Sequence, residues 1–192
     1  MKHMLGIDDA DFIRGKIPMT KQEIRILTLT KARIKETDIV LDIGAGTGSL
    51  SVEAALLAEK GQVYAVERKG EGIELIRRNA EKFGAGNVIA IEGEAPVALA
   101  GLPACDVILI GGSGKYLKEI LDQATALLNP KGRIVLNCIT LQTLYEAVTY
   151  MRQNRNYQYE AIQVQINRLN SVGSYDMAEA LNPIHIVTCE KI

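Results

Sequence analysis

The chain has 192 residues, of which 47% are hydrophobic and 23% are charged, and its formal net charge is −1. This length suits one folded domain with a sizeable core. A protein that neutralises many phosphates usually carries a clear excess of Lys and Arg, so the balanced charge argues against a nucleic-acid partner. No apolar stretch approaches the roughly 18 residues of a membrane span, which argues against a membrane protein.

The cysteines and histidines give no sign of a metal site. Three cysteines lie far apart in apolar, strand-like stretches, namely Cys105, Cys138 and Cys189. That context is typical of buried structural thiols. A zinc site needs paired Cys or His at short spacing, and the chain has only two histidines. We therefore predict no metal ion, and free thiols in a reducing cytoplasm.

Short β-branched runs alternate with helical stretches, a pattern that predicts βαβ units and a mainly parallel sheet. The predicted strands are Ile39–Ile43, Gln62–Val66, Val88–Ile91, Asp106–Ile110 and Arg133–Asn137. Each is a near-continuous apolar run, as expected for strands that are covered on both faces. The predicted helices are Ser51–Lys60, Gly72–Phe83, Tyr116–Leu128 and Leu141–Gln153. A turn is predicted at Asn129–Gly132, because Pro130 presets one backbone dihedral and Gly132 accepts the next.

The last forty or so residues do not continue this alternation of apolar strands and helical stretches. Tyr157–Arg168 alternates apolar and polar side chains, which predicts a long strand with one buried face. A polar segment, Leu169–Asn182, separates it from a final strand at Ile184–Glu190. Five parallel strands would then be followed by a terminal hairpin, with the last strand antiparallel. We expect the connecting segment to be a lid or a contact segment, since long loops in compact domains are usually functional.

A glycine-rich loop follows the first predicted strand and opens a helix, with the sequence Asp-Ile-Gly-Ala-Gly-Thr-Gly at residues 42–48. Alternate glycines allow a tight turn and a close approach to a ligand. A dinucleotide fingerprint needs a third glycine where Ser49 stands, and no Walker Lys-Ser/Thr pair follows. The loop instead resembles motif I of S-adenosylmethionine (SAM)-dependent methyltransferases, in which it wraps the methionine end of the cofactor.

Two further acidic segments follow the second and third predicted strands. Glu67 ends the second strand, where a carboxylate can accept hydrogen bonds from both ribose hydroxyls of an adenosine. Glu92-Gly93-Glu94-Ala95 follows the third strand, where methyltransferases read the adenine with an acidic residue and a backbone amide. Either Glu92 or Glu94 could be the acidic residue, and Ala95 the amide. All three elements lie at carboxyl ends of parallel strands, so they are predicted to meet in one crevice.

Several segments together resemble one family, the cobalt-precorrin carbon-15 methyltransferases (decarboxylating) of cobalamin biosynthesis. They are Ile17–Arg25, Asp42–Gly48, Arg77–Gly84, the Ile-Gly-Gly-Ser-Gly loop at Ile110–Gly114, and Val135–Asn137. The resemblance covers about residues 6 to 190, and its more specific parts are the Pro-Met-Thr-Lys segment and the Gly-Gly-Ser-Gly loop. Motif I alone would indicate only the superfamily.

The resemblance implies an α/β, Rossmann-like class I methyltransferase: a seven-stranded, mainly parallel sheet with an antiparallel last strand and helices on both faces. It implies one domain, 1–192, in which residues 1–38 cover the cofactor and substrate and 39–192 form the core. Members use SAM to methylate carbon 15 of a cobalt-precorrin, converting cobalt-precorrin-6B to cobalt-precorrin-7, and release the carbon-12 acetate carboxyl as carbon dioxide. They are homotetramers. The implied cofactor contacts are Thr20, Gly44, Ala45, Gly46, Thr47, Gly48, Glu67 and Ala95.

The sequence assigns no catalytic residue, and candidate substrate contacts are less specific. An anionic tetrapyrrole calls for cations near the crevice. The cationic candidates are Arg14, Lys21, Lys115 and Arg168, and the polar ones are Asn137, Thr140, Tyr175 and Asp176. His185 is interpreted as structural. Two alternatives remain: a methyltransferase for another small molecule, a protein or RNA, and a SAM-binding module without catalysis.

Overall fold

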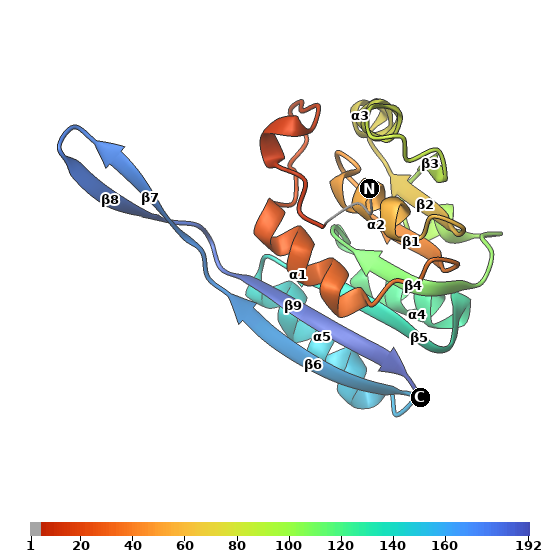
Figure 1. The fold of residues 1–192 in the computed structure, drawn as a ribbon. Helices are drawn as coiled ribbons and strands as arrows, with labels where there is room; N and C mark the ends of the chain where they lie inside the picture. Colours follow the sequence, from red (N-terminus) through yellow and green to blue (C-terminus); the bar gives the residue numbers. More distant parts are fainter. Residues whose placement is uncertain (1–4) are drawn as a thin grey trace.

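The structure, a computed structural model, describes residues 5–192, so the first four residues of the predicted covering segment lie outside the described residues. Its main sheet has seven strands in the order β3-β2-β1-β4-β5-β9-β6 (Figure 1). The strands are β1 Ile39–Ile43, β2 Gln62–Glu67, β3 Val88–Glu92, β4 Cys105–Ile110, β5 Leu128–Cys138, β6 Tyr157–Val164 and β9 Ile184–Lys191.

The first five strands pair in parallel, and β9 pairs antiparallel with both β5 and β6. This arrangement confirms the predicted fold. The chain builds outward from β1 to β2 and β3, then returns to add β4 on the other side of β1. The loops after β1 and β4 therefore diverge to opposite faces, which leaves a crevice at the carboxyl ends of these two strands.

Helices cover both faces of the sheet (Figure 1). One face carries α1 Gln22–Ala32, α2 Ser49–Leu57 and α3 Gly70–Lys82, and the other carries α4 Leu117–Leu127 and α5 Leu141–Gln153. Alternate residues of β1 supply the two cores: Val40 packs toward α1 and α2, whereas Leu41 and Ile43 pack toward α4 and α5. This alternation follows from the two-residue period of a strand.

Three local features differ from the sequence prediction. The turn predicted at Asn129–Gly132 does not precede β5 but lies inside it. There it forms an irregularity in which Lys131 has a φ of 61°. The pairing with β4 accordingly shifts register between Cys105 and Val107. Strand β3 is the edge of the sheet and is not covered on both faces, since Ile89 is 43% exposed. Helix α1 was not predicted, because two residues of its buried face are polar, Arg25 and Thr28.

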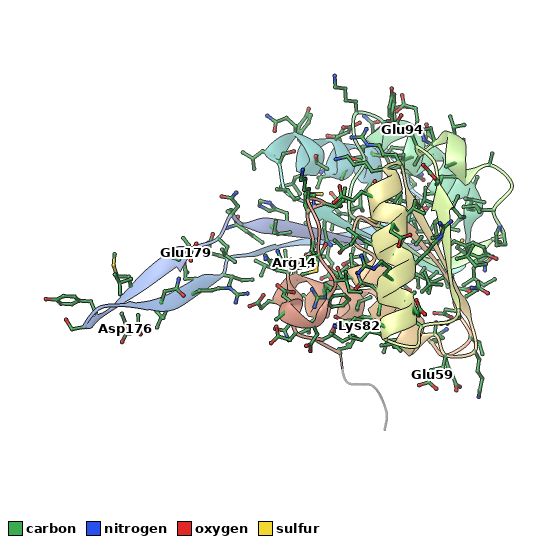
Figure 2. The ribbon with its side chains drawn as sticks, turned by 90° about the horizontal axis from the view of Figure 1, so that it is seen from above. Arg14, Glu59, Lys82, Glu94, Asp176 and Glu179 are labelled. Atoms are coloured by element: carbon green, nitrogen blue, oxygen red, sulfur yellow. The ribbon has the colours of Figure 1, made fainter. Side chains whose placement is uncertain are left out.

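The predicted long strand at 157–168 ends early, and the residues after it form an arm. β7 Asn167–Val172 and β8 Tyr175–Ala180 make a separate two-stranded sheet. This arm projects away from the body of the molecule (Figures 1 and 2). Every residue of its two strands is exposed, so no core of its own holds it. At its base the Arg168 guanidinium donates to the Glu23 carboxylate at 2.8 Å.

Candidate functional site

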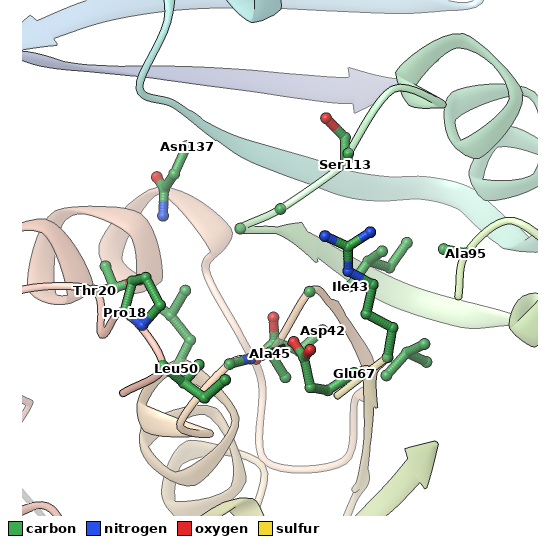
Figure 3. A pocket seen from close by; sticks show the side chains of 18 of the residues that line it. Pro18, Thr20, Asp42, Ile43, Ala45, Leu50, Glu67, Ala95, Ser113 and Asn137 are labelled. Carbon is green, nitrogen blue, oxygen red and sulfur yellow. Dashed lines mark hydrogen bonds between the residues drawn. The ribbon is translucent and has the colours of Figure 1, made fainter. Parts of the chain in front are cut away.

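A cavity of about 420 Å³ opens at the carboxyl ends of β1 and β4. Ligand pockets for small molecules commonly have this size and lie at such switch points. Its walls come from distant segments: residues 17–21, 42–46, 66–69, 93–95 and 111–114, together with Ile24, Leu50, Ile120, Asn137, Ile139 and Ile184. In Figure 3, Thr20 and Pro18 lie on one side of the cavity and Ala95 and Ser113 on the other.

Two glycine loops form the floor of the cavity. A side chain at Gly44 would meet the Gly112 carbonyl oxygen at 2.5 Å and its nitrogen at 2.7 Å. The Gly111 amide also donates to the Ile43 carbonyl at 3.0 Å, which ties the loop after β4 to the end of β1. Gly44 has a φ of 72°, a conformation that glycine adopts without steric cost. The floor thus exposes backbone rather than side chains to a ligand.

Glu67 is held rigidly at the end of β2. Its Oε2 accepts the Gly46 amide at 3.0 Å and its Oε1 accepts the Lys69 amide at 3.0 Å, and the residue is 8% exposed. Each carboxylate oxygen keeps a second lone pair for a ligand hydroxyl. Across the cavity, Glu94 pairs with Arg68 at 2.9 Å, and Ala95 is largely buried. Glu94 is therefore the acidic residue of its segment that lines the cavity, whereas Glu92 does not line it.

Asp42 is the most perturbed carboxyl group of the cavity. Its Oδ2 accepts the Ser51 hydroxyl at 2.5 Å, whereas its Oδ1 is buried without a hydrogen-bond partner in the described chain. Burial, with a smaller contribution from the charge of Glu67, raises the pKa of Asp42 from 3.8 to about 6. An unsatisfied acceptor that lines a cavity is suited to a ligand that brings a donor or a positive charge.

The segment before α1, residues 17–21, is held in place beside the cavity by the buried side chain of Arg25. Arg25 is fully buried and pairs with Glu53 at 2.7 Å and with Asp9 at 2.6 Å. Its guanidinium also donates to the carbonyls of Ile7 and Thr20. A buried ion pair contributes little net stability but fixes geometry, because breaking it leaves an uncompensated charge. The polypeptide at 17–21 is therefore held as a defined wall of the cavity.

The structure brings most predicted cofactor contacts together. Those that line the cavity are Thr20, Gly44, Ala45, Gly46, Glu67 and Ala95. Thr47 and Gly48 lie behind this wall and do not line it. Sequence reasoning missed Arg68 and Lys69, which line the cavity directly after Glu67. Their position next to a predicted ribose-binding carboxylate was the signal that could have identified them.

Two candidate substrate contacts also line the cavity. Lys21 belongs to the wall before α1, and Asn137 lies at the end of β5. The Thr28 hydroxyl lies 2.9 Å from the Asn137 amide oxygen, and the amide nitrogen is buried without a hydrogen-bond partner in the described chain. Asn137 therefore has hydrogen-bonding capacity left for a ligand.

The other candidates lie elsewhere. Arg14 and Lys115 are exposed and do not line the cavity, and Arg168 pairs with Glu23 at the base of the arm. Tyr175 and Asp176 are at the tip of the arm, where Figure 2 shows Asp176 far out from the body. Residues 169–182 were predicted to be a lid or a contact segment; none of them lines the cavity, so in a single copy of the chain they do not form a lid over it.

The remaining polar candidates have structural partners. The Thr140 hydroxyl caps α5 by accepting the Thr143 amide at 3.1 Å, and His185 is hydrogen-bonded to Gln163 at 3.1 Å. The three cysteines are buried and free, as predicted. Across residues 5–192, no cluster of three or more His, Cys, Asp or Glu is placed to hold a metal ion. No helix in the described part of the chain is long and apolar enough to span a membrane.

The fold and the cavity place the chain with proteins of known type. Its structure superposes on a precorrin-6y C5,15-methyltransferase from Geobacter metallireducens with a TM-score of 0.91, at 41% identity over 97% of this chain and 98% of that one. It superposes on a precorrin 8w decarboxylase from Methanobacterium thermoautotrophicum with a TM-score of 0.88, at 32% identity over 95% and 98%. An O-methyltransferase from Thermotoga maritima, at 16% identity and a TM-score of 0.76, shares the fold.

Curated relatives match at similar coverage. A cobalt-precorrin-6B C(15)-methyltransferase (decarboxylating) from Salmonella typhimurium is 34% identical over 95% of both chains. A protein described as a "probable cobalt-precorrin-6B C(15)-methyltransferase (decarboxylating)" from Saccharolobus solfataricus is 44% identical over 97% of this chain and 96% of that one.

The seven-stranded sheet, with a glycine-lined crevice at its switch point, defines a class I SAM-dependent methyltransferase fold. A family model described as the precorrin methyltransferase domain matches residues 12–191. The chain therefore belongs to the precorrin methyltransferase family.

Proposed function

We propose that the protein transfers a methyl group from SAM to carbon 15 of a cobalt-precorrin and removes carbon dioxide from the carbon-12 acetate, converting cobalt-precorrin-6B to cobalt-precorrin-7 in cobalamin biosynthesis. The observation that carries the proposal is the family match across residues 12–191, with relatives of this name at 34% to 45% identity over nearly the whole chain. The cavity at the switch point of the sheet supports it, because ligands of open α/β folds bind there.

The residues of the cavity fit SAM. The proposed contacts that line it are Thr20, Gly44, Ala45, Gly46, Glu67 and Ala95. Glu67 is oriented by two backbone amides and would accept the ribose hydroxyls. The unpaired Asp42 Oδ1 fits a cofactor that carries positive charge at its methionine end. The backbone amide of Ala95, which lines the cavity, would face the adenine.

SAM would supply an already activated methyl group, so the chain mainly has to hold the reacting ring carbon in line with it. The wall at residues 17–21 and the loop at 111–114 line the cavity, where they would shield the bound methyl group from water. Lys21 and Lys69 would supply positive charge along the wall for the carboxylates of the tetrapyrrole, whereas Arg68 is paired with Glu94. Decarboxylation needs an electron sink, which the conjugated macrocycle can provide. Nucleic acid is not among the proposed partners, because the net charge is −1.

Incubation with cobalt-precorrin-6B and SAM, followed by mass spectrometry, tests the reaction. A product that has gained one methyl group and lost one carbon dioxide is expected. A substrate that stays unchanged although SAM binds would overturn the assignment of the substrate. Methylation without loss of carbon dioxide would overturn the decarboxylation.

The cofactor contact is tested with a matched pair of variants. Glu67 and Glu92 stand opposite each other in the β2–β3 register, but Glu92 is exposed. Glu67→Gln should weaken SAM binding by about 1.5–3 kcal/mol, the worth of a hydrogen bond to a charged group. Glu92→Gln, measured in the same titration calorimetry, should leave the dissociation constant unchanged. Equal effects of the two substitutions would contradict the role of Glu67.

We also propose that the protein is a cytoplasmic homotetramer assembled through the arm. A two-stranded hairpin is marginally stable alone in water, yet this arm carries four exposed apolar side chains: Leu169, Val172, Tyr175 and Met177. Val172 pairs with Tyr175 and Asn170 with Met177, so the last three apolar side chains share one face. A second copy of the chain would cover that face.

Light scattering after size-exclusion chromatography tests the assembly. The wild-type protein should elute as four chains, and a variant carrying Tyr175→Ser and Met177→Ser should form a smaller species. Ile89→Ser, which removes a half-exposed apolar side chain from the edge strand β3, is the control and should leave the mass unchanged. A double variant with the wild-type mass would rule out the arm as the interface.

A further inference from the structure

Helix α3 is the platform on which the N-terminal segment rests. Phe12 packs against Phe83 with ring centroids 4.9 Å apart, and the Lys16 amide donates to the Glu71 carboxylate at 2.8 Å. Between these two contacts, residue 13 is held by one side chain near the C-terminal end of the helix, that of Asn79. The segment is thus attached along the length of α3, and its continuation, residues 17–21, forms a wall of the cavity.

The Asn79 carboxamide is fully buried, and all of its hydrogens are used. Its Oδ1 accepts the Ile13 amide at 2.8 Å, and its Nδ2 donates to the Ile13 carbonyl at 3.1 Å. The same Nδ2 donates its other hydrogen to the Thr47 carbonyl at 2.9 Å. This network fixes the orientation of the amide, because a rotated group would set its NH₂ against the Ile13 N–H.

These hydrogen bonds join two parts of the cavity that are distant in sequence. Ile13 precedes the wall at 17–21, and Thr47 belongs to the glycine loop, directly after Gly46, which lines the cavity. Asn79 does not line the cavity itself. A displacement of the N-terminal segment would leave the buried Asn79 Oδ1 and one Nδ2 hydrogen unpaired, and a displacement of the glycine loop would leave the other Nδ2 hydrogen unpaired.

We propose that Asn79 is a positioning residue that couples the N-terminal segment to the glycine loop. The affinity for SAM then depends on whether the N-terminal segment is docked on α3, where Asn79 holds it. This inference rests on the proposed function, in which the glycine loop binds SAM. The coupling is reciprocal, as any linkage between two equilibria must be. Bound SAM therefore strengthens docking of the segment, and a docked segment strengthens SAM binding.

The chain contains a matched control for Asn79. Asn87 also donates from its side-chain nitrogen to backbone carbonyls, those of Ala55 at 3.2 Å and Ala58 at 2.7 Å. It directly precedes β3, whereas the cavity lies at the other end of the strands. Figure 2 shows the two ends well separated, with Glu59 at one and Glu94 at the other. Removing either carboxamide deletes several hydrogen bonds to backbone, but only Asn79 borders the SAM loop.

Titration calorimetry of SAM with Asn79→Ala and Asn87→Ala, well below their melting temperatures, tests the proposal. Asn79→Ala should raise the dissociation constant at least about tenfold, and Asn87→Ala less than about twofold. Equal shifts, or no shift in Asn79→Ala, would overturn the coupling. A wild-type protein that does not bind SAM would instead overturn the proposed function on which it rests.

Hydrogen exchange of the wild-type protein tests the coupling without any variant. SAM should slow exchange of the Ile13 amide, which bonds to Asn79, although Ile13 does not line the cavity. The control is the Lys60 amide, which donates to the Glu36 carbonyl at the other end of the sheet. Slowing of Ile13 by at least about fivefold more than Lys60 is expected for local opening of the segment. Equal slowing of both amides would overturn the proposal.

Discussion

Replacement of Asp42 by Asn should stabilise the protein in the absence of ligand. The Asp42 carboxyl is fully buried, and burial raises its pKa from 3.8 to about 6. Each tenfold change in proton affinity corresponds to about 1.4 kcal/mol, so the ionised form destabilises the folded state by roughly 3 kcal/mol. Asn has the same shape and no charge, and its amide oxygen can still accept the Ser51 hydroxyl. The free energy of unfolding should therefore rise by up to about 3 kcal/mol at pH 7.5.

The pH dependence gives the sign of the effect. As the pH falls through 6, folded wild-type protein takes up a proton at Asp42, whereas the unfolded chain does so only near pH 4. Wild-type stability therefore rises relative to the variant across this window, and the difference between the two proteins should vanish below about pH 4. Because SAM is cationic, the same substitution should weaken its binding, so stability and affinity change in opposite directions.

Urea denaturation at several pH values between 4 and 7.5 measures the difference. Glu59→Gln is the control, since it removes the same charge from an exposed position that does not line the cavity. A variant that is less stable than wild type at pH 7.5, or a stability difference that does not change with pH, would refute the reasoning from burial.

Two further predictions concern the glycine floor and the thiols. Gly44→Ala should weaken SAM binding at least about tenfold in titration calorimetry, because its Cβ would overlap the backbone of Gly112. The control is Gly84→Ala, which should not weaken binding, because Gly84 has a similar φ but open space around its Cβ. Equal effects of the two substitutions would disprove the steric argument. Burial raises the pKa of all three thiols, to about 11 for Cys138 and about 12 for Cys105 and Cys189. They should therefore not react with Ellman's reagent at pH 8 until the protein is unfolded, and rapid reaction of the native protein would contradict their burial.

The sheet was predictable where pattern and tertiary environment agree. Strand β1 and helix α5 have the predicted bounds. A short apolar run fits the interior of a sheet, and a stretch with helical apolar periodicity fits a helix packed against it. The register irregularity in β5 was not predictable, because a Pro-Lys-Gly turn signal is local and says nothing about continued pairing with β4. Helix α1 was missed because its buried face includes Arg25, which only a long-range partner, Glu53, makes tolerable there.

The same distinction applies to the site. Glu67 and the Gly44–Gly46 stretch were predictable to line one crevice, because the carboxyl ends of parallel strands meet at one edge of the sheet. Asn79 was not, since a buried asparagine in a helix has the same sequence context as a solvated one. Its role follows from its contacts with Ile13 and Thr47, which are far from it in sequence.

The position of β9 has a consequence for synthesis of the chain on the ribosome. β9 lies between β5 and β6, so it is an interior strand of the sheet although it is made after both. Until residues 184–191 have emerged, β6 has no partner in the main sheet, and β5 presents a free, apolar edge that can pair with other chains. Ile184 is also part of the wall of the cavity. The sheet and the proposed SAM site are therefore completed together, once β9 has been translated. A nascent chain that stalls before residue 184 is expected to aggregate rather than to bind cofactor.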